Sequence, residues 1–427
     1  MEEGIEKRRI TTTEDLSNDL TVEILLLLPL TSVIQCFNVC KRWRSLITGC
    51  PSLLNYTVNV AWIRHDSFRR YTCLEEGQRR MQSSELDFFL DSPMQSQRQR
   101  VPPASSYLNH LSCNGLLFSY FLSRLRADLN QCYISNPLTK ECVRLPNPNM
   151  GCHDSLCGLA FENNPRIINS SCNNRAFFKI VMAHSINLDR EKASYQFEIY
   201  SSDKSGWQLL KTASKPHDPS SIKPDQNAVY VNRVLYWLCP GISKALMFNL
   251  VTETSDYLEL PTHYDETYCK LTVCDGHLHY IRRHYDRYRG RDRLSLLKMS
   301  KNGDWLILDH VDLQGAMERY WDLFPMRERN FYYPIFRPID MSCQGDDKVL
   351  LSDSYRRIVS YDLKWDVFEI VLEKDNIQMH KLFRYTPTNK RIVIEELQHE
   401  FRTKRSTQLK QLSNYVRKLL ECFKSAS

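Results

Sequence analysis

The stretch CYISNPLTKECVRLP, residues 132–146, reads as a strand, a polar turn and a second strand, and the fold class follows from the recurrence of this hairpin along the chain. Each repeat places β-branched or aromatic residues on both sides of a turn that contains Asn, Asp, Ser or Gly. Four further copies follow: EIYSSDKSGWQLL (198–210), LMFNLVTETSDYLELP (246–261), LLKMSKNGDWLILD (296–309) and IVSYDLKWDVFEIV (358–371).

The spacing of these hairpins predicts a β-propeller. The turn markers Asn136, Asp203, Asn249, Asn302 and Asp362 are separated by 67, 46, 53 and 60 residues. Known propeller blades repeat every ~40 to 50 residues, so these spacings fit blades with insertions. Further strand-like runs between the markers, such as GLLFSYF and FKIVMAH, can supply the remaining strands of each blade. The fold class is therefore mainly β, and the body is predicted to hold about six blades.

Ahead of this body the pattern is helical. From Leu16 to Ile47 the apolar residues recur at spacings of three to five, which indicates helices rather than strands. Pro29 ends the first helix, Ser32 or the Thr before it caps the second, and Gly49 ends the third. The N-terminus is therefore predicted to form three short helices.

The first of these helices is apolar around nearly its whole circumference. Val22 and the run from Ile24 to Leu28 leave little polar surface on it. A helix that is apolar all round must be buried all round, and a unit of ~35 residues is too small to do this with its own atoms. Either another protein or the rest of the chain must cover the outer face, so the sequence predicts a docking surface here.

The residues DLSNDLTVEILLLLPLTSVIQCFNVCKRWRSLI (15–47) resemble the F-box motif over its whole length. The resemblance implies that this segment binds the Skp-type adaptor of an SCF (Skp, cullin, F-box) ubiquitin ligase, and through it the cullin and RING subunits. The adaptor-binding residues implied are Leu16, Leu20, Ile24, Leu25, Leu28, Pro29, Val33, Val39, Cys40, Trp43, Leu46 and Ile47. The sequence departs from the family pattern at Ser17, Leu27 and Gln35, which leaves the adaptor affinity open.

The body resembles the F-box-associated and kelch-related propellers of plant F-box proteins in CNGLLF (113–118), SNPLTKECVRLP (135–146) and YSSDKSGW (200–207). The chain has 13 Gly and no adjacent Gly pair, whereas strict kelch repeats carry such pairs, so the blades are divergent. Together the two resemblances imply a non-catalytic substrate receptor whose propeller binds a target protein. One rival is an F-box scaffold or sensor in a complex that does not ubiquitinate, and a second is a propeller enzyme.

The expected organisation is a disordered tail (1–12), an F-box domain (13–60), a linker (61–105), a target-binding propeller (106–397) and a basic amphipathic helix (398–427). Apolar residues of the last segment recur at spacings of three and four, as in a helix that packs on the body or binds a partner. That segment holds +5 of the net charge of +7, which argues against a nucleic-acid groove across the body.

The 15 cysteines are odd in number and scattered, as expected for reduced thiols in the cytoplasm or nucleus. The longest Leu-rich run, Ile24 to Leu28, is far shorter than the ~20 residues of a membrane span. No membrane association is expected.

Two stretches of the body are candidates for binding the target. IRRHYDRYRGRDR (281–293) is rich in arginine, whose guanidinium groups can hold an acidic or phosphorylated segment. A solvated hairpin loop, partly neutralised by Asp286 and Asp292, is the favoured interpretation. Residues 320–336 are rich in aromatics, which serve as binding hot spots or as packing between blades. The candidate residues are Arg282, Arg283, Arg287, Tyr320, Trp321, Tyr332 and Tyr333.

Metal and enzyme sites are not expected. The two sets of candidate ligands lack the paired C-x-x-C spacing of structural zinc sites; they are Cys152, His153 and Cys157, and Cys269, Cys274, His277 and His279. A sialidase-type Asp-box at Ser201 to Trp207 has offsets that are wrong by one residue. No cofactor and no catalytic residues are therefore predicted.

Overall fold

The fold is described from a computed structural model of the chain. The residues that it describes are 16–28, 32–33, 36, 39–50, 58–63, 71–75, 82–86, 106–123, 130–136, 141–150, 155–162, 175–187, 193–204, 206–215, 227–239, 243–261, 266–286, 291–320, 322–323, 335–341, 348–353, 357–372, 382–385 and 391–392. The expected N-terminal tail (1–12) and C-terminal helix (398–427) lie outside these ranges.

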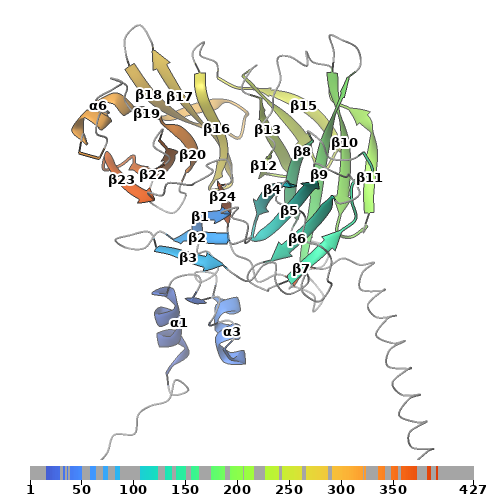
Figure 1. Cartoon of the computed structure of the whole chain (residues 1–427), viewed down its shortest axis with the longest axis horizontal. Coiled ribbons are helices and arrows are strands. Elements are labelled where there is room, and N and C mark those ends of the chain that lie inside the picture. Colours follow the sequence, from blue (N-terminus) through green and yellow to red (C-terminus); the bar gives the residue numbers. More distant parts are fainter. Residues whose placement is uncertain are drawn as a thin grey trace, which may run out of the picture.

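Two helices stand at the N-terminus, α1 (Asn18–Leu26) and α3 (Lys41–Gly49), and they lie side by side in Figure 1. Between them Ser32, Val33 and Cys36 have helical backbone. Two of the three expected helices are therefore present, and the middle one stays a prediction beyond these three residues. Among the described residues, no helix is long and apolar enough to span a membrane.

Five antiparallel sheets follow one another along the body, and we call them blades 1 to 5. Blade 1 comprises β4 (Ser106–Cys113), β5 (Leu116–Ser123), β6 (Gln131–Asn136) and β7 (Glu141–Leu145). Blade 2 comprises β8 (Leu156–Glu162), β9 (Arg175–Asn187), β10 (Ala193–Ser201) and β11 (Gly206–Ala213). Blade 3 comprises β12 (Val229–Val231), β13 (Val234–Cys239), β14 (Lys244–Asn249) and β15 (Thr254–Glu259).

Blade 4 comprises β16 (Glu266–Cys274), β17 (His277–Asp286), β18 (Arg291–Met299) and β19 (Trp305–Asp312). The helix α6 (Leu313–Arg319) follows it. Blade 5 comprises β20 (Arg337–Met341), β21 (Lys348–Ser352), β22 (Ile358–Asp362) and β23 (Val367–Leu372). The first strands of neighbouring blades contact one another in chain order, from β4 to β20, and the blades are arranged side by side in Figure 1.

The five recurring hairpins are confirmed as the third and fourth strands of the five blades. The first two strands of three blades are joined by tight turns at Asn114–Gly115, Asn232–Arg233 and Asp275–Gly276. Both central residues of each turn have positive φ, between 44° and 82°. This is the turn geometry that matches the right-handed twist of an antiparallel pair.

The expectation of about six blades within 106–397 is corrected, because the described residues of that region form five complete blades. A further four-stranded sheet, in the order β24-β1-β2-β3, combines β24 (Leu382–Tyr385) with β1 (Val58–Ile63), β2 (Tyr71–Glu75) and β3 (Gln82–Leu86). These three early strands lie in or beside the stretch 61–105, which was expected as a linker. Since β1 and β24 are more than 300 residues apart, no local turn signal reveals their pairing.

A second C-terminal strand also returns to the body. β25 (Arg391–Ile392) pairs in parallel with the start of β9. The backbone N–H of Ile392 donates to Glu141 Oε2 of blade 1 at 2.8 Å, and its side chain packs against the core shared by blades 1 and 2. The segment after β24 therefore ties these two blades together.

The hydrophobic core is divided into clusters that lie between neighbouring blades. Between blades 2 and 3 the fully buried Trp237 donates its indole N–H to the carbonyl oxygen of Cys157 at 3.0 Å. A Cβ at Gly158 would lie only 2.7 Å from Leu235 Cδ1, so glycine is required for this close approach. Two tryptophans of the recurring hairpin also donate to the preceding blade, Trp207 to Pro146 O and Trp305 to Glu259 O.

A buried polar group fixes the connection between blades 1 and 2. Glu198 of β10 is fully buried and accepts backbone N–H groups from Asn149 at 2.9 Å and Met150 at 3.4 Å. His184 of β9 lies with Nε2 3.3 Å from Glu198 Oε2 and with Nδ1 2.8 Å from Ser155 Oγ. Burial lowers the pKa of His184, although the charge of Glu198 opposes the shift, so the imidazole is neutral in the folded protein at neutral pH.

This histidine predicts a loss of stability in acid. Because the pKa of His184 is lowered on folding, the unfolded chain binds the proton more readily, and the free energy of unfolding falls as the pH drops below the unfolded pKa of about 6.5. The urea midpoint should be lower at about pH 5.5 than at about pH 7.5, and this drop should be larger in the wild type than in His184→Gln. The other histidines contribute equally to both proteins, so equal falls would contradict the assignment.

Candidate functional site

The candidate site is the surface of the two N-terminal helices, and local interactions set where each helix begins. Ser17 is the N-cap of α1, and its side chain accepts the N–H of Leu20 at 3.2 Å. Cys40 is the N-cap of α3, and its sulfur accepts the N–H of Trp43 at 3.4 Å. Arg42 joins the two helices by donating from Nε to Asn18 Oδ1 at 3.1 Å and from Nη2 to the carbonyl oxygen of Leu16.

The cap at Ser17 explains one departure from the F-box pattern, which has Pro at this position. The Ser17 hydroxyl satisfies a helix N–H that otherwise has no intrahelical partner. Ser17→Ala should therefore destabilise α1 by about 1 kcal/mol. Amide hydrogen exchange of the first turn in the full chain would measure this as faster exchange of Leu20, and unchanged exchange would contradict the role of the cap.

A small core holds the helices together. Leu25, Val33 and Ile47 are at most 1% exposed and form its centre. The partly buried residues around them are Val22, Leu26, Leu28, Cys36, Trp43 and Cys50. Burial raises the pKa of the Cys36 thiol, so this sulfur stays protonated and behaves as a small apolar group. The unit therefore has an interior of its own, built from one side of each helix.

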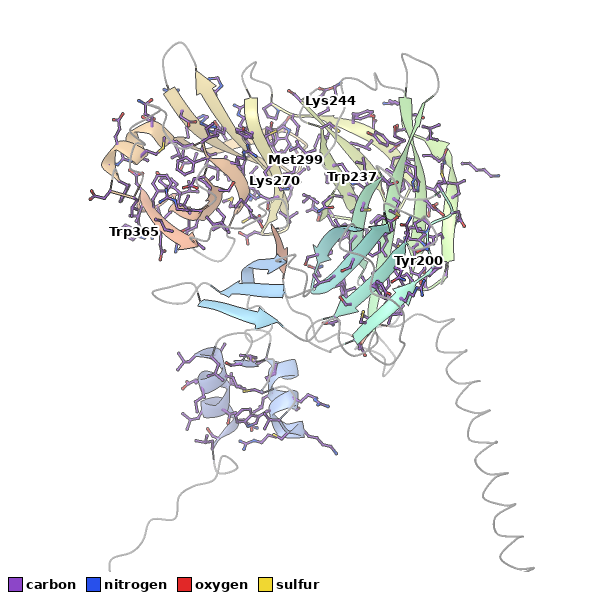
Figure 2. The ribbon with its side chains drawn as sticks, in the orientation of Figure 1. Tyr200, Trp237, Lys244, Lys270, Met299 and Trp365 are labelled. Atoms are coloured by element: carbon purple, nitrogen blue, oxygen red, sulfur yellow. The ribbon has the colours of Figure 1, made fainter. Side chains whose placement is uncertain are left out.

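The opposite side of α1 is apolar and exposed. Leu20, Ile24 and Leu27 are 51%, 43% and 80% exposed. They follow one another at spacings of four and three residues, so they lie on one face of the helix. Val39, just before α3, is 67% exposed as well. We call Leu20, Ile24 and Leu27 the exposed apolar face. Figure 2 draws the side chains of the two N-terminal helices as sticks.

The structure separates the expected adaptor-binding residues into groups with different positions. Leu20, Ile24 and Val39 are available to a partner, whereas Leu25, Val33 and Ile47 are buried inside the unit. Cys40 is exposed. Leu16, Leu28, Trp43 and Leu46 are partly buried, and Pro29 lies outside the described residues.

The most exposed member of this face, Leu27, was not among the expected contacts. In the sequence it stands out only as a departure from the F-box pattern, in which this position is usually basic. The helical period that starts at Leu20 and Ile24 does point to Leu27, because a third residue of the same face follows at i+7. The run of four leucines from Leu25 to Leu28 does not show which of them faces outward, because all four are equally apolar.

Two of the three arginine candidates, Arg282 and Arg283, lie inside blade 4. Arg282 and Arg283 are each 5% exposed, and Arg282 donates from Nη1 to the carbonyl oxygen of Pro261 at 2.9 Å. Arg283 donates from Nε to both carboxylate oxygens of Asp292, at 2.7 and 3.0 Å. Burial raises the pKa of Asp292, and the hydrogen bond and charge of Arg283 oppose that rise. These two arginines are therefore placed to hold the blade together rather than to stand on an open loop.

A third arginine joins this region from the next blade. Arg337, the exposed first residue of β20, lies over the Tyr268 ring at 4.6 Å and donates to the Tyr268 hydroxyl at 3.3 Å. Arg283 lies 5.9 Å from the same ring. Tyr268 of β16, Arg283 of β17 and Arg337 of β20 therefore lie close together where β20 contacts β16 and β17, and we call this place the rim between blades 4 and 5.

The aromatic candidates are described only in part. Tyr320 follows α6, and its hydroxyl donates to the carbonyl oxygen of Asp366 at 3.1 Å while its ring contacts Phe368 edge-on. This tyrosine packs α6 against blade 5. Arg287, Trp321, Tyr332 and Tyr333 lie outside the described residues.

The candidate metal ligands do not come together where they are described. Cys157 is buried between blades, and His279 Nδ1 lies 3.1 Å from the carbonyl oxygen of His277. In the described part of the chain, no three His, Cys, Asp or Glu side chains form a group that could hold a metal ion. Cys152 and His153 lie outside that part.

Comparison with known proteins gives two family matches. The model described as "F-box protein At3g26010-like, beta-propeller" matches residues 78–418, and the F-box domain model matches residues 14–55. The chain is similar to the F-box protein At5g03970 of Arabidopsis thaliana, with 23% identity over 327 residues and coverage of 70% of each chain. It is also similar to the solved structure of YjhT, with a TM-score of 0.35, 8% identity, and coverage of 70% of this chain and 90% of that one.

Proposed function

Because this chain belongs to the family of F-box proteins with an At3g26010-like β-propeller, we propose that it is the substrate-recognition subunit of an SCF-type cullin-RING ubiquitin ligase. The observation that carries the proposal is the exposed apolar face of the F-box helices. Leu20, Ile24 and Leu27 expose between 43% and 80% of their side chains. A contiguous apolar patch at the surface marks a protein interaction site, and in an F-box domain the partner expected there is the Skp-type adaptor.

The role assigned to the propeller is to hold a target protein. A receptor of this kind makes and breaks no bonds; it raises the effective concentration of a target lysine near the ubiquitin thioester. The rim between blades 4 and 5 is the proposed place of contact, because Arg337 presents its guanidinium there against Tyr268. In Figure 1 the β17–β18 end of blade 4 lies on the side of the body away from α1 and α3, so adaptor and target would not compete for space.

Co-purification from plant extract tests the proposal. The wild-type chain should bring down a Skp-type adaptor together with cullin and RING subunits, and the complex should form ubiquitin chains on co-purified proteins. Adaptor without cullin or chains would instead support an F-box scaffold or sensor in a non-ubiquitinating complex. Recovery of neither adaptor nor cullin would refute the assignment. Fractionation of the same tissue should find the protein in the cytoplasm or nucleus.

A further inference from the structure

The rim between blades 4 and 5 carries an exposed arginine that forms no ion pair with the described part of the chain. Arg337 is the first residue of β20, and its side chain contacts Tyr268. The guanidinium lies over the tyrosine ring at 4.6 Å, and Nη2 donates to the hydroxyl at 3.3 Å. A guanidinium has five N–H donors, so most of those of Arg337 remain available to a ligand.

A buried ion pair supports this tyrosine from inside the blade. Tyr268 stands opposite Arg283 in the pairing of β16 with β17, and the Arg283 guanidinium lies 5.9 Å from the Tyr268 ring. Asp292 fixes Arg283 in turn by accepting from its Nε at 2.7 Å. Arg283 and Asp292 are only 5% and 4% exposed. The groups therefore follow in the order carboxylate, guanidinium, ring and guanidinium, and Arg337 is the exposed end of this series.

The strand register places this series on the face of blade 4 that packs against blade 5. Leu294 stands opposite Arg283 and belongs to the core cluster that the two blades share. Directly paired residues lie on one face of a sheet, and the next residue along a strand lies on the other. Arg293 is exposed too, but it therefore lies on the opposite face of blade 4. It belongs to the same end of the blade and not to the rim.

The acidic side chains described near the rim have other partners or lie on the other face. Asp292 belongs to the buried ion pair. Asp340 of β20 accepts a hydrogen bond from the hydroxyl of Thr272 on β16. Asp312 stands opposite Arg293, on the face of blade 4 turned away from the rim. Among the described residues, no carboxylate therefore contacts the exposed guanidinium, and its charge is available to an anionic group from outside.

We propose that Arg337, stacked on Tyr268, binds an oxyanion of the target protein, which is either a phosphate group or a side-chain carboxylate. A planar guanidinium presents pairs of N–H donors that match both oxyanions, and stacking on a ring holds it in one orientation. This inference rests on the proposed target-binding role of the propeller, and it names the class of segment that the rim takes. Arg283 supports the site from inside, and Arg337 makes the contact.

Retention of the full chain on immobilised peptide pools tests this binding. Three pools carry phosphoserine, glutamate or serine at one fixed position between degenerate flanks. Binding is measured at about 150 mM salt, where long-range attraction between exposed charges is screened. The phosphoserine pool, the glutamate pool or both should retain wild type at least about 10-fold better than the serine pool. The better of the two identifies the source of the oxyanion, and equal retention by all three pools would overturn the proposal.

Two arginine variants separate the site from the general charge of the blade. Arg337→Ala should abolish the preference for anionic pools, and Arg337→Lys, which keeps the charge but lacks the planar fork, should reduce it. Arg293→Ala is the matched control, because it removes the same charge from the opposite face of the same blade end, and it should keep the preference. A preference that survives Arg337→Ala, or that Arg293→Ala abolishes equally, would overturn the proposal.

Two tyrosine variants test the stacking. Tyr268→Phe keeps the ring under the guanidinium and should retain the preference, whereas Tyr268→Ala should weaken it. Equal loss in both variants would contradict the stacking. The pools contain no adaptor, so the two proposals can fail separately. A wild type that forms ubiquitin chains but does not prefer anionic pools refutes this inference alone, and the reverse result refutes the ligase role alone.

Discussion

Replacing Ile24 and Leu27 together with lysine is expected to abolish adaptor binding while the protein stays folded. Both side chains are exposed, at 43% and 80%, so their loss removes little from the interior of the F-box unit. On docking, each aliphatic side chain would contribute ~1.5–3 kcal/mol by burial, and a buried lysine without a partner costs more. The affinity should therefore fall by at least about 100-fold. Titration of purified adaptor against the full chain would measure the fall.

Two controls separate docking from folding. Val251→Lys introduces the same charge at a position of blade 3 that is 62% exposed, and it should bind the adaptor as wild type does. Leu25→Lys places a charge in the centre of the F-box core, where Leu25 is 0% exposed, and it should unfold the helices and lose binding for that reason. Leu28 is partly buried, so Leu28→Asp would mix the two effects. A folded Ile24→Lys/Leu27→Lys protein with wild-type affinity would refute the docking face.

Trp237→Ala is expected to destabilise the propeller by about 3–5 kcal/mol. Trp237 is 0% exposed, and it fills the space between blades 2 and 3 close to Gly158. Its removal leaves a cavity, and it also takes away the indole donor that satisfies the carbonyl oxygen of Cys157 at 3.0 Å. Urea unfolding followed by circular dichroism should show a clearly lower midpoint. Figure 2 shows Trp237 within the body and Trp365 at its margin.

The exposed Trp365 is the matched control. It is 68% exposed on the turn between β22 and β23, so Trp365→Ala should change stability by no more than about 0.5 kcal/mol. Trp237→Phe keeps most of the ring but lacks the N–H donor, and it should cost about 1–3 kcal/mol. If Trp237→Ala and Trp365→Ala shift the midpoint equally, the packing role of Trp237 is wrong.

The sequence predicts where the docking site lies, but it does not predict which of its leucines face outward. The helical period and the excess of leucine predict a surface between Leu16 and Ile47 that a partner or the rest of the chain must cover. The structure shows Leu20, Ile24 and Leu27 exposed there, and docking stays a prediction. The period did not assign each leucine to a side, since five consecutive apolar residues fit any rotation of the helix. The contact between α1 and α3 fixes that rotation, because it buries Leu25 against Ile47 and leaves Leu27 outside.

The proposed target-binding rim, in contrast, could be predicted from the sequence only in small part. The arginines of 281–293 stand out by composition, but composition does not show that Arg283 is neutralised by Asp292 within the same sheet. No pattern in the sequence selects Arg337 as a binding residue, because it is an isolated basic residue there. Only the packing of β20 beside β16 brings it onto Tyr268.

The elements that depend on neighbours along the chain can be predicted from the sequence alone. These are the five hairpins of the blades, whose turns and alternating strands are local, and the F-box, whose motif is continuous over 33 residues. The features that depend on distant partners are set by the three-dimensional packing of the chain. The pairing of β24 with β1 and the tie of Ile392 to Glu141 have no local signature, because burial and pairing there are set by strands far away in the chain.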